Sequence, residues 1–120
     1  MFLTVERASL LEAVSKLQRV VGAKTSMPIL EGILISAEQG KATLVAYNLE
    51  MGMKKELYAK CDKAGDIVIN ARLLADILRR MNGIQVEIEA DEKLNCHIKS
   101  GEATFDIMGM AATDFPEMPS

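Results

Sequence analysis

The sequence predicts an α+β fold made of two units, each with one strand, one helix and three further strands. Two stretches place apolar residues at helical spacing, and the runs around them are short and β-branched or alternate between apolar and polar residues. The same order of elements occurs over residues 1–64 and again over residues 65–110. Two such units would pair their strands into antiparallel sheets and lay both helices on one side of them.

The first unit opens with a strand and then changes to helical periodicity. Leu10, Val14, Leu17 and Val21 recur three or four residues apart, and Gly22 provides a stop signal. The predicted elements are a strand at 2–6, a helix at 7–22, an extended run at 29–37, a hairpin turn at 38–41, and strands at 42–47 and 51–61.

The second unit repeats this order. Asn70 is a favourable N-cap for a helix with an apolar stripe through Leu74 and Leu78, and Asn82-Gly83 ends that helix. The predicted elements are a strand at 66–69, a helix at 71–82, and strands at 85–90, 94–98 and 103–107.

Length and composition indicate one packed domain, because the chain has 120 residues and 49% of them are apolar. Residues 111–120 have no periodicity and contain Pro116 and Pro119, so we expect a linker to a further domain there. No apolar run approaches the roughly 20 residues that span a bilayer, and no signal peptide is visible. Two cysteines, Cys61 and Cys96, are too few for a disulfide framework. The sequence therefore predicts a cytoplasmic protein with reduced thiols.

The residue patterns of catalysis are missing from the sequence. It has no P-loop, no dinucleotide fingerprint and no nucleophile elbow. His97 is the only histidine, which excludes His-pair metal sites and most Ser–His constellations within the chain. Cys96 and His97 are adjacent on a predicted strand, so their side chains point to opposite faces. We therefore expect no catalysis, no metal and no cofactor.

Positive charge is concentrated on the two predicted helices and the turn through Lys24. These segments carry seven basic and two acidic residues, a net charge of +5, whereas the rest of the chain carries seven basic and fifteen acidic residues, a net charge of −8. The basic residues are Arg7, Lys16, Arg19, Lys24, Arg72, Arg79 and Arg80, and the acidic ones are Glu12 and Asp76. An acidic protein with this distribution is suited to meeting a polyanion on one side only.

The basic helix faces carry no aromatic side chains. Binders of single strands, and the sheets that recognise RNA, use aromatic stacking platforms. The pattern favours contact with the backbone of duplex DNA without sequence preference, which is weak and salt-sensitive when few cations make it. Two alternatives remain open at this point. One is a free-standing non-specific nucleic-acid-binding module, and the other is a small enzyme or regulatory subunit whose basic faces are only solvated.

Short motifs along the whole chain carry a resemblance to a known family. They are Thr4-Val5-Glu6-Arg7, Met27-Pro28-Ile29-Leu30, Asn48-Leu49-Glu50-Met51, Val68-Ile69-Asn70-Ala71-Arg72 and Ala112-Thr113-Asp114-Phe115-Pro116. Together, and in this order and spacing, they make the chain similar to the first domain of the bacterial DNA polymerase III beta subunit, the sliding clamp family.

The resemblance implies the DNA clamp fold, three such domains in each subunit, and a head-to-tail homodimer that closes into a ring. Helices would line the ring and double-stranded DNA would pass through it. The protein would then be a processivity factor that tethers the replicative polymerase, while nucleotidyl transfer belongs to the DNA-directed DNA polymerase complex that it serves. The DNA polymerase III catalytic subunit and the clamp loader would bind to domains outside this chain.

The resemblance also assigns roles to individual residues. It implies DNA contact by Lys24 and by Arg72, Arg79 and Arg80 on the second helix. Lys16 and Arg19 are included because of their helix face. It implies a subunit interface at the last strand, with Phe105 and Ile107 at its apolar positions.

Overall fold

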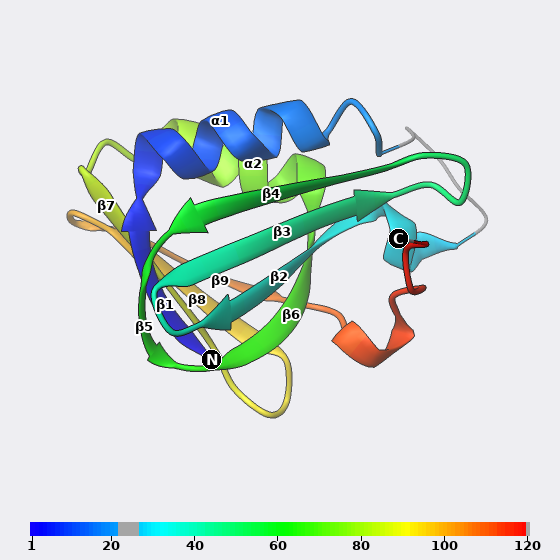
Figure 1. Ribbon diagram of the computed structural model, residues 1–120. Coiled ribbons are helices and arrows are strands. Elements are labelled where there is room, and N and C mark those ends of the chain that lie inside the picture. Colours follow the sequence, from blue (N-terminus) through cyan, green and yellow to red (C-terminus); the bar gives the residue numbers. More distant parts are fainter. Residues whose placement is uncertain (22–26, 120) are drawn as a thin grey trace.

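Two helices lie side by side over two antiparallel sheets in the computed structural model, which describes residues 1–21 and 27–119 (Figure 1). This arrangement confirms the predicted α+β class and the placement of both helices on one side. The helices are α1 (Arg7–Leu17) and α2 (Ala71–Arg80), with 3₁₀ turns at Pro28–Glu31 and Ala112–Asp114. The strands are β1 (Phe2–Glu6), β2 (Gly32–Glu38), β3 (Lys41–Tyr47), β4 (Gly52–Tyr58), β5 (Lys60–Lys63), β6 (Gly65–Asn70), β7 (Gln85–Ala90), β8 (Asn95–Ser100) and β9 (Ala103–Met108).

The two predicted units exchange their first strands. The sheets have the orders β5-β1-β7-β8-β9 and β4-β3-β2-β6, so β1 pairs with the second unit and β6 with the first. Leu3 lies opposite Ile88, and Ile35 lies opposite Ile67. Because each sheet needs a strand from the other unit, the two units share one core and neither can bury its apolar face alone.

The predicted single strand at 51–61 is wrong. The chain forms β4 and β5 in different sheets, where β4 pairs with β3 and β5 pairs with β1. The buried Ala59 lies at the crossing, and its backbone N–H donates to the carbonyl oxygen of Gly40. The small side chain lets the strand change sheets without leaving a gap in the packing.

Several other predicted bounds differ from the structure, including the end of the second helix, which lies at Arg80 and not at residue 82. The helix expected to reach residue 22 ends at Leu17, and Gly22 lies outside the described residues. The extended run expected at 29–37 begins with a 3₁₀ turn, since Pro28 has the fixed φ that suits a first helical position. Leu94, expected in a strand, is a turn residue with φ of +70°.

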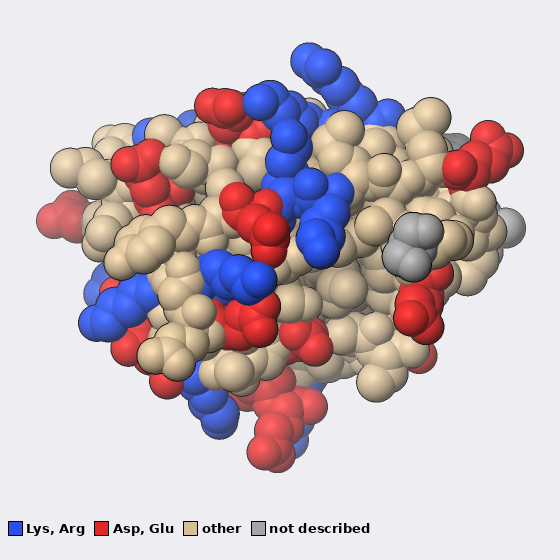
Figure 2. All heavy atoms as spheres, viewed as in Figure 1, with Lys and Arg blue, Asp and Glu red and all other residues tan. Residues whose placement is uncertain are grey.

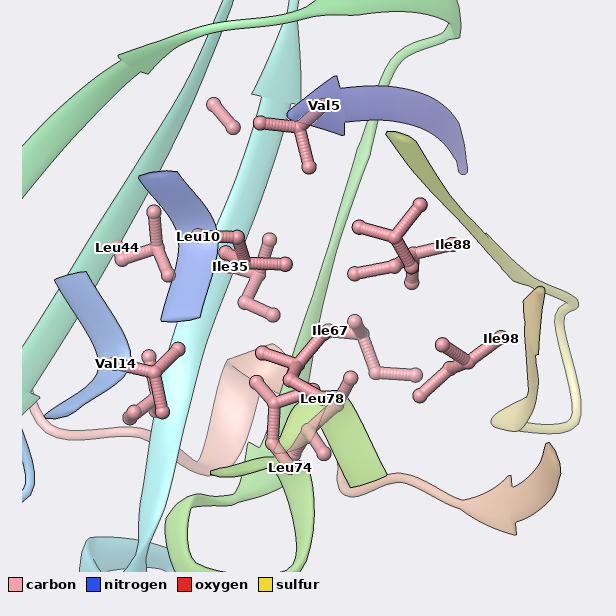
Figure 3. Packing of buried hydrophobic residues seen from close by; sticks show 14 of the residues in the cluster. Val5, Leu10, Val14, Ile35, Leu44, Ile67, Leu74, Leu78, Ile88 and Ile98 are labelled. Carbon is pink, nitrogen blue, oxygen red and sulfur yellow. The ribbon is translucent and has the colours of Figure 1, made fainter. Parts of the chain in front are cut away.

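The core fills the space between the helices and the inner faces of both sheets, and Figure 3 shows its centre. Leucines and valine from the helices meet branched aliphatic side chains from the strands, and every residue of this set is buried: Val5, Leu10, Val14, Ile35, Leu44, Ile67, Leu74, Leu78, Ile88 and Ile98. None of the helices in the described parts of the chain is long and apolar enough to cross a membrane.

Part of the expected linker packs onto the domain. Phe115 is buried in a second cluster with Leu30, Tyr47 and Val68. Met110 and Val68 exchange backbone hydrogen bonds of 2.8 and 3.0 Å. Met118 packs against the same cluster, so the chain is held to the domain as far as Met118. That it continues into a further domain stays a prediction.

Candidate nucleic-acid interface

Lys and Arg side chains gather along the edge of the molecule that α1 and α2 form, with a few acidic side chains between them (Figure 2). This edge is the candidate interface, and we call it the helix face. Of the predicted DNA-contacting residues, it contains Lys16, Arg19, Arg72, Arg79 and Arg80, all of which are exposed. Lys24 lies outside the described residues.

The sequence of α2 places its basic residues on the helix face. The Oδ1 atom of Asn70 accepts a hydrogen bond from the backbone N–H of Leu73 (2.9 Å), so the predicted N-cap is confirmed. Leu74 and Leu78 are buried against the core, as predicted. The polar residues Arg72, Asp76, Arg79 and Arg80 consequently face solvent.

The cations of α2 are weakly engaged within the domain. Arg79 Nη1 lies 3.4 Å from Asp76 Oδ1, and both side chains are about half exposed. Surface pairs of this kind contribute little to stability, so Arg79 can exchange the carboxylate for another anion. Arg72 and Arg80 have no ionic or hydrogen-bonded partner within the described residues. Arg79 and Arg80 also complement the dipole at the C-terminal end of α2.

The first helix contributes fewer cations than its sequence predicts. Lys16 is exposed, and its Nζ lies 3.1 Å from Oε1 of Glu12 one turn earlier. Arg19 follows the end of α1, in a turn where its backbone N–H donates to the carbonyl oxygen of Lys16. The predicted helical position of Arg19 is therefore wrong, because α1 ends two residues before it, but its side chain remains exposed.

Arg7 is one of the seven basic residues in the predicted helical segments, but it is not one of the exposed cations of the helix face. Its Nε donates to the carbonyl oxygen of Gly83 (2.8 Å), and its Nη1 donates to that of Leu78 (3.2 Å). The Leu78 carbonyl lies in the last turn of α2 and also accepts a 3.4 Å hydrogen bond from the backbone N–H of Met81, whereas Gly83 lies beyond the end of the helix. The sequence hints at this only weakly, through a cation at the first position of a helix, where the dipole disfavours it.

The expected interface residues lie on the edge strand β9. Phe105 and Ile107 are half-buried and pack against the main core cluster. Their side chains therefore stabilise the domain itself, whatever else they contact. In the described parts of the chain β9 pairs only with β8, so its other edge keeps free backbone donors and acceptors.

The adjacent Cys96 and His97 diverge as predicted. Cys96 is buried, and this burial raises the pKa of its thiol to about 11. His97 is exposed, and its Nδ1 lies 2.6 Å from Oδ1 of Asp106 on the neighbouring strand. Within residues 1–21 and 27–119, no group of three or more His, Cys, Asp or Glu side chains is placed to hold a metal ion.

The exposed guanidinium and ammonium groups of the helix face are of the kind that pair with phosphate, and two helices in contact with each other carry them. The model of one family, DNA polymerase III beta subunit, N-terminal domain, matches residues 1–119. The chain belongs to this family. Relatives of this beta-subunit domain match the chain along almost its whole length.

Two relatives show the extent of the match. The chain is 35% identical to the "Beta sliding clamp" of Caulobacter vibrioides (strain NA1000 / CB15N), over 100% of this chain and 33% of that protein. It is 32% identical to the "Beta sliding clamp" of Micrococcus luteus, over 97% of this chain and 37% of the relative. The chain thus spans about a third of the length of these relatives.

Solved structures give the same result for the fold. A DNA polymerase III beta subunit from Eubacterium rectale superimposes with a TM-score of 0.96 at 31% identity, covering 100% of this chain and 33% of that chain. The Caulobacter crescentus pol III beta structure superimposes with a TM-score of 0.93 at 36% identity, covering 100% and 32%. The predicted DNA clamp fold is therefore confirmed.

Proposed function

We propose that the full-length protein is a DNA polymerase processivity factor that closes into a ring-shaped homodimer around double-stranded DNA. The helix face of this domain forms part of the inner surface of the ring. The ring slides along DNA without sequence preference and tethers the replicative polymerase. It is a non-catalytic accessory subunit, and nucleotidyl transfer belongs to the DNA-directed DNA polymerase complex that it serves.

One observation carries the proposal: cations without strong partners occupy the surface that α1 and α2 share, in a chain whose net charge is −3. Arg72 and Arg80 have no partner within the described residues, and Lys16 and Arg79 make only exposed pairs. The outer face of β7 carries the exposed acids Glu87 and Glu89. This polarity favours DNA on the helix side and disfavours it on the sheet side.

Weak contact suits a sliding protein. Each phosphate contact releases counterions and is salt-sensitive, so the few cations proposed here, with Lys24 added, give low affinity to any one position on the duplex. Encirclement keeps the local DNA concentration high without tight binding. Processivity then arises from the topology of the ring and not from strong contacts.

Ring closure requires contact between subunits, and we propose that the free edge of β9 takes part in it. An unpaired strand edge offers backbone groups to a partner strand. Phe105 and Ile107 support this edge from the core side. A second copy of the full-length subunit would meet β9 head to tail, through a domain outside this chain.

The remaining partners follow from membership of the family. We propose that the DNA polymerase III catalytic subunit and the clamp loader bind domains outside this chain, and that the protein acts in the cytoplasm. For this reason no residue of this domain is assigned to their capture.

Retention on nicked circular duplex DNA tests the function. Full-length protein loaded onto the circle should remain bound, and it should be lost rapidly after a single restriction cut. Equal retention on circular and linear DNA would overturn the ring mechanism and favour a non-specific surface binder. No retention on either form would contradict both.

A further inference from the structure

The turn between β3 and β4 presents two apolar side chains to solvent. Leu49 and Met51 are 54% and 57% exposed. Neither contributes to the two clusters of buried residues. Single exposed apolar residues need no explanation, but two in one short turn do.

The backbone at Leu49 is in an unfavourable conformation. Its φ is +76°, in the left-handed region that branched and bulky residues rarely adopt. A residue held there without local compensation is a reason to look for a function.

Leu94 offers an internal comparison. It also has a positive φ, +70°, but its side chain is partly buried and packs against the main core cluster. At Leu94, the burial of the side chain within the domain offsets the free-energy cost of the left-handed backbone conformation. Within the described residues, the exposed Leu49 has no such compensation.

Asn48 holds the turn in this conformation. Its Oδ1 accepts hydrogen bonds from the backbone N–H groups of Glu50 (2.9 Å) and Met51 (2.8 Å). Its Nδ2 donates to the carbonyl oxygen of Val20, just after α1 (3.2 Å). The two apolar side chains are therefore presented on a fixed support and not on a loose loop.

The described chain comes to its end beside this turn. Gly52, which follows Met51, lies so close to Met118 that a Cβ atom there would overlap the Met118 sulfur. Figure 1 likewise shows the C-terminal end near the hairpin end of β3 and β4. The family match is to an N-terminal domain and this chain covers 33% of the length of one relative, so in a full-length subunit of this family the following segment would start beside this turn.

We propose that Leu49 and Met51 are a docking patch for the segment of the full-length subunit that follows residue 120, and that Asn48 positions this patch. Contact with that segment supplies the apolar burial that Leu49 lacks in the domain alone. The proposal rests on the proposed function, because it takes the longer subunit as given. The following segment is favoured over other occupants because the chain leaves the domain at the patch itself.

Oxidation of Met51 by hydrogen peroxide, followed by mass spectrometry without DNA, tests the patch directly. In the 120-residue chain Met51 should oxidise rapidly, and in the full-length chain at least about tenfold more slowly because the following segment covers it. Met81, which is buried, should oxidise slowly in both. Equal rates at Met51 in the two chains would overturn the proposal. Protection of Met51 that appears only when DNA or polymerase is added would also overturn it, because the cover would then be that partner. Protection in the 120-residue chain that rises with protein concentration would overturn it too, because the cover would then be a second copy of the domain.

Substitution of Leu49 gives a second readout. Asn tolerates the left-handed region, so Leu49→Asn should raise the melting temperature of the 120-residue chain by a few degrees. In the full-length chain the same change should speed Met51 oxidation several-fold. Leu94→Asn is the matched control: it should lower the melting temperature and leave Met51 protection unchanged. A lower melting temperature for Leu49→Asn would mean that the domain itself compensates Leu49, which contradicts the proposal.

Both readouts are taken without DNA. If Met51 is not protected in the full-length chain, the docking patch is wrong, but the ring mechanism is still tested by retention on circular DNA. If retention on circular DNA fails, the ring mechanism is wrong, but the oxidation result still tests the docking patch.

Discussion

Arg7 Nη1 in α1 donates to the carbonyl oxygen of Leu78 in α2, across 3.2 Å and 71 residues of sequence. With the 2.8 Å bond from Nε to Gly83, one guanidinium ties the start of α1 to the end of α2. It donates to one carbonyl in the last turn of α2 and to one just beyond that helix. The relative position of the two helices, and so the geometry of the helix face, depends in part on this contact.

Replacing Arg7 should therefore destabilise the domain. Arg7→Met keeps much of the apolar stem but removes both charged donors, and we expect a loss of about 2 kcal/mol in the free energy of unfolding, measured with urea. Arg7→Lys should recover part of the loss, since an ammonium can reach one carbonyl but cannot reproduce the planar fork. Equal stability of wild type and Arg7→Met would show that these bonds contribute nothing.

Charge reversal on α2 should remove most of the weak DNA affinity of the domain. In a titration of the 120-residue chain with a short duplex at low salt, followed by NMR, Arg72→Glu/Arg80→Glu should abolish the shifts seen with wild type. Lys93→Glu is the control, since Lys93 lies in the turn between β7 and β8, away from the helices (Figure 1). A larger effect of Lys93→Glu would show that the duplex binds the opposite side of the domain and not the helix face.

The two cysteines should differ in reactivity. Burial raises the pKa of Cys96 to about 11, so its reactive thiolate is scarce near neutral pH. Cys61 is only half-buried. Iodoacetamide at pH 8 should alkylate native protein at Cys61 first, and should reach Cys96 only after urea is added. Rapid labelling of native Cys96, detected by peptide mass spectrometry, would contradict its buried position.

Asp91 should give the domain a measurable acid dependence. Hydrogen bonds from the Asn95 side chain, then from the Asn95 backbone, hold the pKa of Asp91 below its ordinary value of 3.8. Because the folded pKa is lowered, the carboxylate stabilises the fold above pH 3.8, and this contribution is lost as the pH falls through the folded pKa. Wild type should melt above Asp91→Asn at pH 6, and the two melting temperatures should converge toward pH 2. A gap that does not change with pH would rule out this linkage.

The periodicity of the sequence predicts most elements of this fold, because amphipathic helices and alternating strands carry a local signal. Val86 and Ile88 are buried while Glu87 and Glu89 are exposed, as alternation predicts. The exchange of β1 and β6 between units has no such signal, since it is decided by long-range pairing. The break at Ala59 is missed for the same reason: only the change of sheet shows that the run at 51–61 is two strands.

The helix face could be predicted in part. The apolar stripe of α2 fixes which side of the helix its arginines occupy, so their exposure follows from spacing alone. The engagement of Arg7 does not follow, because its acceptors are backbone carbonyls more than 70 residues away. The exposure and the backbone conformation of Leu49 could not be predicted either. In the sequence, Asn48-Leu49-Glu50-Met51 stands out only as a family motif.

The most direct test of the central claim places a photocrosslinking amino acid in the full-length protein loaded on circular duplex DNA. At Asp76, in the middle of the exposed side of α2, irradiation should join the protein to the duplex. At Lys93 it should not. Crosslinks from position 93 but not from position 76 would show that DNA lies against the other side of the domain, and the helix face would have to be abandoned as the lining of the ring.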